Sequence, residues 1–126
     1  MAKFRFTLRR DDQLDCTNLR GQTSESWRCV DCGTNTAPGC RGRAELEQAF
    51  RHHYAVEETI DDHSEVYMVH DPVWKEAGMG PWDGCLCIGC LEKRLGRKLR
   101  PEDFGRDHEF YIAPGTKRLR DRRGCP

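Results

Sequence analysis

The feature that most constrains this chain is a pair of Cys-x-x-Cys motifs separated by 54 residues. In the first motif, Cys29 and Cys32 are followed by Gly33, and a glycine there permits the left-handed backbone of a zinc knuckle. In the second motif, Cys87 and Cys90 lead directly into a helical segment, whose dipole and free N–H groups favour thiolate ligands. Four thiolates fill a tetrahedral shell and leave no open position. The sequence therefore predicts one structural Zn2+ ion, bound by Cys29, Cys32, Cys87 and Cys90.

The other four cysteines leave alternatives open. Cys85 competes with Cys87 as a ligand, and we favour Cys87 because its spacing to the last cysteine of the motif repeats the first pair. Cys16, Cys40 and Cys125 have no partner at ligand spacing, so we expect small core residues or surface thiols. A second ion bound by Cys40 and a histidine is the alternative.

The choice between metal ligation and disulfides depends on the cellular compartment. Eight cysteines could form four disulfides in an exported protein. The N-terminal segment MAKFRFTLRR lacks the apolar run of a signal peptide, so we expect a cytoplasmic protein, in which spaced cysteines more often bind metal. No stretch approaches the roughly 18 apolar residues of a membrane span, which argues against an integral membrane protein.

Composition and periodicity predict a small α+β fold. The 126 residues suffice for one domain, and only 37% are hydrophobic, so zinc would supply much of the folding free energy. We expect a treble-clef-like zinc module with a short antiparallel sheet and two to three helices. The expected strands cover residues 4–8, 65–69 and 108–113, and the expected helices cover residues 44–58, 72–77 and 87–99.

The last expected helix and the chain ends carry further predictions. Leu91, Leu95 and Leu99 share one helix face, against which we expect the sheet to pack. Gly96 lies inside this segment, so the helix either packs closely there or ends early. We expect one zinc-binding domain over residues 1–114, with residues 40–63 as an insertion, followed by a basic, mobile tail over residues 115–126.

Charge is distributed unevenly, although the net charge is zero. Residues 52–92 carry nine acids and one lysine, whereas residues 93–126 carry eleven bases and five acids. The zero net charge excludes a uniformly basic nucleic-acid coat, but the basic C-terminal third could contact DNA, RNA or a host protein. The candidate residues for nucleic-acid binding are Arg94, Arg97, Lys98, Lys117, Arg118, Arg120, Arg122 and Arg123.

A structural interpretation of the same arginines stands beside the binding one. Glu65, Glu92 and Asp103 could hold them in intramolecular ion pairs. Nothing in the pattern identifies side chains that would read base edges. The aromatic side chains are expected to build the small core around the zinc rather than to stack on bases; they are Trp27, Tyr67, Trp74 and Trp82.

Two enzyme classes are alternatives to a binding module. HNH endonucleases are built on a treble clef, and a nuclease here would need His70 with Asp71, or His52 with His53, to bind a second metal. On the expected helix 44–58, however, His53 shares the apolar side, which favours a partly buried structural histidine. A thioredoxin-like redox protein also has a Cys-x-x-Cys at a helix start, but two such pairs argue for one shared metal.

Three segments together resemble a known family. WRCVDCGTNTAPG, SEVYMVHDPVW and LCIGCLEKRLGRKLRPEDF, within residues 27–104, are similar to a family of small uncharacterised proteins found in actinobacteria and their phages. The resemblance implies a zinc-binding module with the four-cysteine site and assigns no activity. Together these observations predict a cytoplasmic, non-enzymatic zinc-binding protein that contacts a nucleic acid or a protein.

Overall fold

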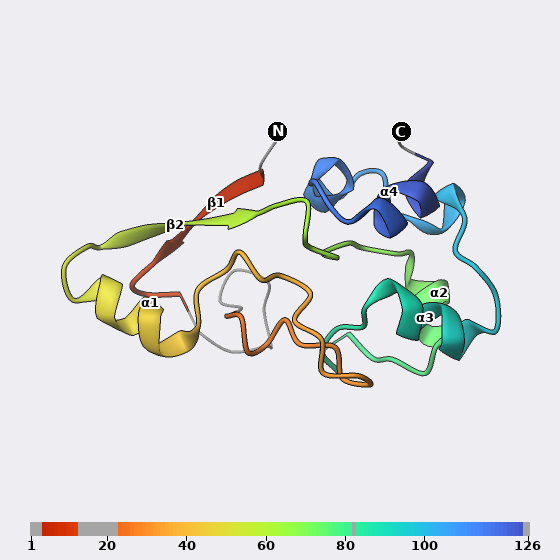
Figure 1. Ribbon diagram of the computed structural model, residues 1–126, viewed down its shortest axis with the longest axis horizontal. Coiled ribbons are helices and arrows are strands. Elements are labelled where there is room, and N and C mark those ends of the chain that lie inside the picture. Colours follow the sequence, from red (N-terminus) through yellow and green to blue (C-terminus); the bar gives the residue numbers. More distant parts are fainter. Residues whose placement is uncertain (1–3, 13–22, 82, 125–126) are drawn as a thin grey trace.

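The protein has a small α+β fold, as predicted. The structure, a computed structural model, describes residues 4–12, 23–81 and 83–124. It contains a two-stranded antiparallel sheet, four α-helices and two short 3-10 helices (Figure 1). In chain order these are β1 (Phe4–Arg9), α1 (Arg43–Phe50), β2 (Ala55–Ile60), α2 (Asp71–Glu76), α3 (Ile88–Leu95), η2 (Pro101–Asp103), η3 (Glu109–Ile112) and α4 (Lys117–Arg123).

The sheet and α1 form one end of the molecule. The predicted first strand is confirmed as β1, which pairs with β2 in a register that places Leu8 opposite Val56. These two side chains are buried with Leu46 and Phe50 of α1 in one apolar cluster. Alternate residues of a strand point to opposite faces, so β1 can present this apolar side to α1 while its other side faces solvent.

The predicted helix over residues 44–58 is right only in its first half, because α1 ends at Phe50 and β2 follows. The inward-facing positions of β2 are Val56, Glu58 and Ile60, and all three are buried. Glu58 interrupts an otherwise apolar alternation, which conceals the strand in the sequence. Its carboxylate is tolerated there because Arg41 donates to it from both the main-chain N–H, at 2.7 Å, and the guanidinium, at 2.6 Å.

Two predicted strands are wrong. Residues 65–69 are extended, but their only bridge in the described chain joins Val69 to Phe104. The neighbouring backbone groups bond to separate loops instead: the Glu65 N–H donates to Thr36 and the Gly105 N–H donates to Met68. Within residues 108–113, Glu109–Ile112 form the 3-10 helix η3, because the ring of its N-cap residue His108 accepts a hydrogen bond from the Phe110 N–H at 3.1 Å, which turns the chain.

The predicted helices after residue 70 are found with earlier ends. In α2 a proline occupies the first turn, as expected. The next helix, α3, ends at its C-cap residue Gly96, which is left-handed with a φ of 71°. Of the two alternatives for this glycine, close packing or an early helix end, the structure shows the early end. Leu99 is buried beyond the helix. The predicted packing of the sheet on this face is wrong, because Leu91 and Leu99 pack with Val73, Phe104 and other residues outside the sheet.

Within the segment expected to be a basic, mobile tail, residues 117–123 form helix α4. Thr116 caps it by accepting a hydrogen bond from the Leu119 N–H, and Gly124 ends it with a φ of 77°. Leu119 is fully buried against the core around α3. Arg123, one turn later, is also buried and donates to main-chain carbonyls of the η3 region. Leu119, through apolar packing, and Arg123, through hydrogen bonds from its two Nη atoms, therefore anchor this segment.

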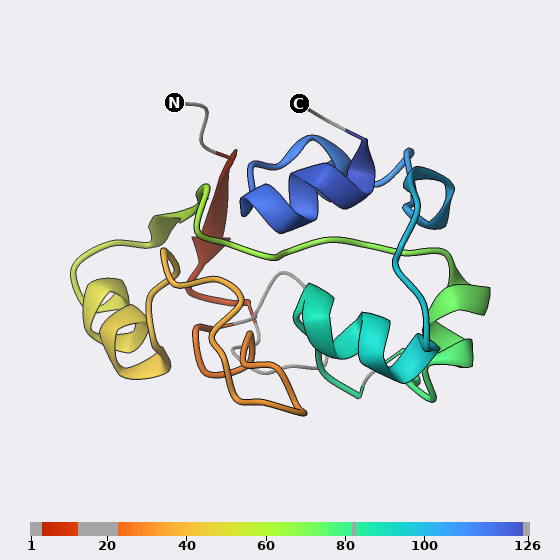
Figure 2. The same ribbon diagram turned by 45° about the vertical axis from the view of Figure 1, so that its right-hand side comes forward.

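An extended segment connects the two ends of the molecule. Residues 61–70 run from the end of β2 to the start of α2 and pass between α3 and α4 in both views (Figures 1 and 2). Glu65 lies in this segment, so its carboxylate can meet both helices. None of the helices in the described ranges is long and apolar enough to cross a membrane.

Candidate metal centre

The structure brings together the four cysteines of the two Cys-x-x-Cys motifs. The sulfur atoms of Cys29, Cys32, Cys87 and Cys90 all lie within 4.8 Å of one another, so the group could hold a metal ion. The Sγ atoms of Cys32 and Cys87 are 3.7 Å apart. Metal–sulfur bonds of about 2.3 Å in a tetrahedron require a sulfur–sulfur separation of roughly 3.8 Å, whereas a disulfide requires about 2.0 Å. All four thiols are free, and their spacing fits a tetrahedral ion.

The first pair lies on a tight turn of the knuckle type. The Cys29 N–H donates to the Thr34 carbonyl and the Gly33 N–H donates to the Cys29 carbonyl, both at 2.8 Å. Gly33 adopts a φ of 78°, the left-handed conformation expected of a glycine at this position. This turn directs both sulfurs to the same side. A parallel bridge between Cys29 and Cys85 then brings the second motif alongside the knuckle.

The second pair lies at the start of α3. Cys87 is the N-cap residue and Cys90 lies in the first helical turn. The first N–H of the helix, that of Ile88, donates to a carboxylate oxygen of Glu65 at 2.9 Å. A helix N-terminus favours negative charge because its N–H groups lack partners within the helix. Glu65 therefore satisfies and orients the end of the helix that carries two of the four sulfurs.

The four sulfurs differ in exposure and acidity. Cys29 and Cys87 are buried, whereas Cys32 is exposed. Hydrogen bonds with Thr34 lower the pKa of the Cys32 thiol to about 6, assisted by Cys29. Burial raises the pKa of Cys87 and Cys90. The Cys32 thiol is thus more easily deprotonated than those of Cys87 and Cys90, and a bound cation would favour deprotonation of these two.

Contacts outside the sulfur group connect the knuckle to the helix. Arg94 of α3 forms a two-pronged ion pair with Asp31 of the knuckle, at 2.8 and 2.7 Å. The same guanidinium donates to the Ala77 carbonyl at the end of α2, at 3.0 Å. One side chain therefore joins three segments around the sulfurs. Sequence reasoning missed Asp31 and Thr34, although both lie within or beside the first motif, where residues that orient ligands are expected.

The remaining cysteines lie outside this group. The thiol of Cys85 lies 3.1 Å from the Trp27 carbonyl, so the structure places Cys87, and not Cys85, among the four. Cys40 is buried in the cluster that contains Trp27 and Phe110. Burial, with Glu58 nearby, raises the pKa of the Cys40 thiol to about 12, as expected of a small core residue. Cys16 and Cys125, like Trp82, lie outside the described residues.

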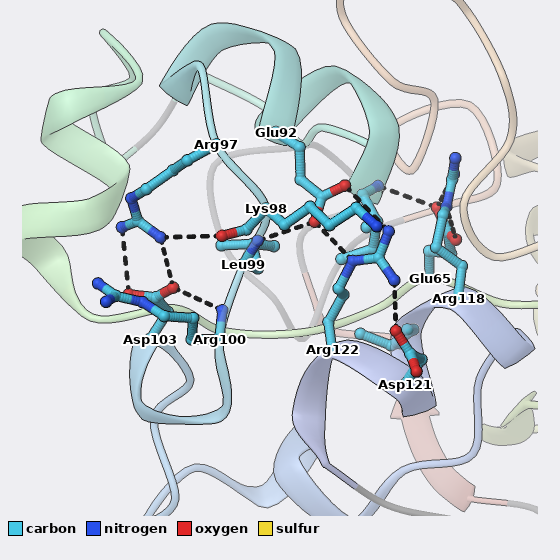
Figure 3. Close-up of polar contacts among 12 residues, drawn as sticks. Glu65, Glu92, Arg97, Lys98, Leu99, Arg100, Asp103, Arg118, Asp121 and Arg122 are labelled. Atoms are coloured by element: carbon cyan, nitrogen blue, oxygen red, sulfur yellow. Dashed lines mark hydrogen bonds and ion pairs between the residues drawn. The ribbon is translucent and has the colours of Figure 1, made fainter.

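Most of the arginines predicted to bind nucleic acid have intramolecular partners (Figure 3). Each of the three carboxylates named as alternatives binds one of them. Arg97 pairs with Asp103 at 2.8 Å, Arg118 with Glu65 at 2.8 Å, and Arg122 with Glu92 at 2.7 Å. Burial alone would raise the pKa of each carboxyl, but these hydrogen bonds outweigh it and lower the pKa of Asp103, Glu65 and Glu92.

Three of the predicted cations remain on the surface. Lys98, Lys117 and Arg120 are exposed and form no ion pair within the described part of the chain. On α4, Lys117 and Arg120 are three residues apart and share a side, whereas Arg118 and Arg122 are four apart and face α3. The helix therefore presents one cationic side to solvent and directs the other to internal carboxylates.

The histidines do not assemble a second centre. Within the described ranges, the four cysteines are the only group of three or more His, Cys, Asp or Glu side chains that could hold a metal. His53 is exposed beyond the end of α1, so its predicted partial burial is wrong. His70 is the exposed N-cap residue of α2.

No family model, curated protein or solved structure matches the chain, and the family resemblance stays a prediction.

Proposed function

We propose that this protein is a non-enzymatic zinc-binding module in which one structural Zn2+ ion is bound by Cys29, Cys32, Cys87 and Cys90. The observation that carries the proposal is the convergence of four sulfurs within 4.8 Å. A set of four thiolates suits zinc, or iron in a sulfur-ligated site, better than magnesium or calcium. A complete tetrahedral shell has no position for a substrate or an activated water, so the ion acts on the fold and not on a reaction.

Metal analysis of purified protein tests this proposal. Elemental analysis should find about one zinc per chain, and native mass spectrometry should find the same stoichiometry. Cys90→Ser removes one of the four ligands and should abolish stoichiometric binding. Cys40→Ala is the matched control, because Cys40 is also buried but hydrogen-bonds to the Thr59 carbonyl away from the group. Loss of zinc in both variants, or its retention in Cys90→Ser, would contradict the assignment.

We further propose that the module contacts the phosphates of DNA or RNA through the exposed cations of its C-terminal third. The net charge of residues 93–126 and the solvent-facing side of α4 support this proposal. The contact set is narrower than the eight residues of the sequence prediction. Four of the eight bind carboxylates and a fifth, Arg123, is buried; the four are Arg94, Arg97, Arg118 and Arg122. The remaining candidates are Lys98, Lys117 and Arg120.

Fluorescence anisotropy with a labelled mixed-sequence oligonucleotide tests the contact. Arg120→Glu should weaken binding and reduce the slope of log affinity against log salt by about one to two, because one phosphate contact is lost and one charge is reversed. Arg51→Glu is the matched control, since it reverses an exposed arginine at the end of α1. Equal effects of the two variants would mean that binding depends on the net charge of the protein and not on a contact at Arg120. No binding by the wild type would favour a protein partner.

A further inference from the structure

The side chain of Arg118 lies directly against the second cysteine motif. Its guanidinium donates two hydrogen bonds to Glu65, at 3.0 and 2.8 Å. The same carboxylate accepts from the Thr116 hydroxyl at 2.7 Å and from the Ile88 N–H at 2.9 Å. The Glu65 side chain is 8% exposed and the Arg118 side chain is 44% exposed, so the carboxylate side of this pair is buried. Four donors on one buried carboxylate fix the position of the guanidinium.

That position is over Gly89, one of the two residues between Cys87 and Cys90. A Cβ atom added to Gly89 would lie 2.7 Å from the Nη1 atom of Arg118. The glycine between Cys87 and Cys90 therefore leaves the space that the guanidinium occupies. The Glu65 carboxylate, and to a smaller extent the Cys87 thiol, raise the pKa of Arg118, in keeping with a cation close to both groups.

A cation beside the cysteines would offset negative charge when the site holds Zn2+. Four thiolates around Zn2+ leave an excess of two negative charges in a partly buried site. Groups outside the ligand shell that orient or neutralise ligands commonly change metal affinity by about 10- to 100-fold. Glu65 cannot supply this charge, because it is negative; its role is to hold the arginine.

We propose that Arg118, held by Glu65, is a positioning residue of the metal centre that slows the release of the ion by placing positive charge beside Cys87. The inference rests on the proposed zinc site. It also gives α4 a task beyond packing, since this helix carries the charge to the sulfurs of α3. Docking of α4 and retention of the metal are then coupled.

The chain contains a matched control for this role. Arg122 lies one turn further along α4 and pairs with Glu92 of α3 at 2.7 and 3.3 Å (Figure 3). Both arginines therefore join the same two helices through a carboxylate. Only Arg118 lies over the Cys-x-x-Cys backbone, whereas Glu92 and Asp121 are the groups that raise the pKa of Arg122. Removal of either arginine should loosen α4, but only one removal should affect the metal directly.

The experiment measures the rate of zinc transfer from the loaded protein to a coloured chelator, 4-(2-pyridylazo)resorcinol. Arg118→Gln should accelerate transfer about 10-fold, and Arg118→Lys should restore part of the difference because it keeps the charge but not the two-pronged contact. Gly89→Ala should also accelerate transfer, because the guanidinium must move away, although alanine favours the helix. Arg122→Gln should stay within about 2-fold of the wild type.

Hydrogen exchange of the α4 amides is the second readout. It should rise in both Arg118→Gln and Arg122→Gln if each arginine helps to dock the helix. Equal acceleration of zinc transfer by these two variants would overturn the inference, since docking alone would then explain it. Wild-type transfer kinetics in Arg118→Gln would also overturn it. A wild-type protein that carries no zinc to transfer would instead overturn the proposed function on which the inference rests.

Discussion

The two ends of the molecule are stabilised by different interactions. At one end, which we call the sheet region, β1, β2 and α1 enclose Leu8, Leu46, Phe50 and Val56. At the other, the metal region, the knuckle at residues 29–34 lies with α2, α3 and α4 around the four sulfurs and the core beneath them. The sheet region has its strand ladder and apolar burial, each fully buried side chain contributing about 1.5 to 3 kcal/mol. The metal region adds a set of arginine–carboxylate pairs that join its helices.

This difference indicates which part of the chain would depend on the proposed ion. The helices of the metal region have at most eight residues, too few to be stable alone. Short helices and loops that meet at four thiols gain their folding free energy largely from ligation, as in other small zinc domains. The sheet region contains none of the four sulfurs and needs no ion for its own contacts.

Removal of the metal should therefore have the largest effect and should act unequally. Structural zinc contributes on the order of 10 kcal/mol in small zinc domains, so chelation should abolish exchange protection in α3 and the knuckle. Protection of the β1–β2 ladder should fall least. Hydrogen exchange followed by mass spectrometry, with and without a chelator, measures both regions in one sample. A uniform loss of protection would show that the two regions unfold as one unit.

A cavity in the sheet region should produce the second-largest effect and should leave metal binding intact. Leu46 is fully buried, so Leu46→Ala should cost about 2 to 5 kcal/mol of unfolding free energy in urea. Zinc stoichiometry should stay at the wild-type value. Leu91→Ala is the counterpart, because Leu91 is equally buried but lies in the core under the sulfurs. It should lower both stability and metal retention; zinc loss in both variants would break the comparison.

The metal region was the more predictable of the two from sequence, because ligand chemistry is local. The spacing within each Cys-x-x-Cys motif selected the four cysteines that the structure groups, and it favoured Cys87 over Cys85. Gly33 was expected to be left-handed, and at Gly96 an early helix end was one of two alternatives; both glycines have a positive φ. The distance between the motifs, however, said nothing about Glu65, whose contacts to α3 and α4 depend on a segment that passes between them.

The errors have a common cause, which is that tertiary partners decide ambiguous segments. A strand needs a neighbour, and residues 65–69 have only one bridge. The inward Glu58 hides β2 because its partner, Arg41, is distant in sequence. Helix α4 lies where a tail was expected, because a charged composition does not tell which side chains point inward. Arg123 was counted as a surface base, yet it is 4% exposed.

Arg123 provides the third prediction. Its guanidinium donates to the carbonyls of Phe110, Tyr111 and Ala113, at 3.2, 2.9 and 2.8 Å. Arg123→Gln would remove the guanidinium donors to these carbonyls and should cost about 2 to 3 kcal/mol in urea unfolding. Arg120→Gln changes an exposed arginine of the same helix and should stay within about 0.5 kcal/mol of the wild type. Similar costs for the two would contradict the anchoring role of Arg123.

The smallest predicted effect concerns the Arg97–Asp103 ion pair. Its contribution to the free energy of unfolding should depend on pH differently from the contribution of the proposed zinc ion. Arg97 and the Arg100 N–H hold the buried Asp103 carboxylate, each at 2.8 Å, and Asp103→Asn should cost about 1 to 2 kcal/mol at pH 7. The pKa of Asp103 is lowered by folding, so its contribution is complete above the ordinary aspartate pKa of about 3.9 and is lost as the pH falls through the lower, folded value.

The stability difference between wild type and Asp103→Asn should therefore be the same at pH 7 and pH 5, as measured by urea unfolding of zinc-loaded protein. The zinc-dependent part of the stability should decline over this range, because protons compete with the metal for the thiolates. Between pH 7 and pH 5 the contribution of Asp103 should thus stay constant while the contribution of zinc falls. A difference at Asp103 that already shrinks between pH 7 and pH 5 would mean that folding does not lower the pKa of its carboxyl group, and that the pair with Arg97 contributes little.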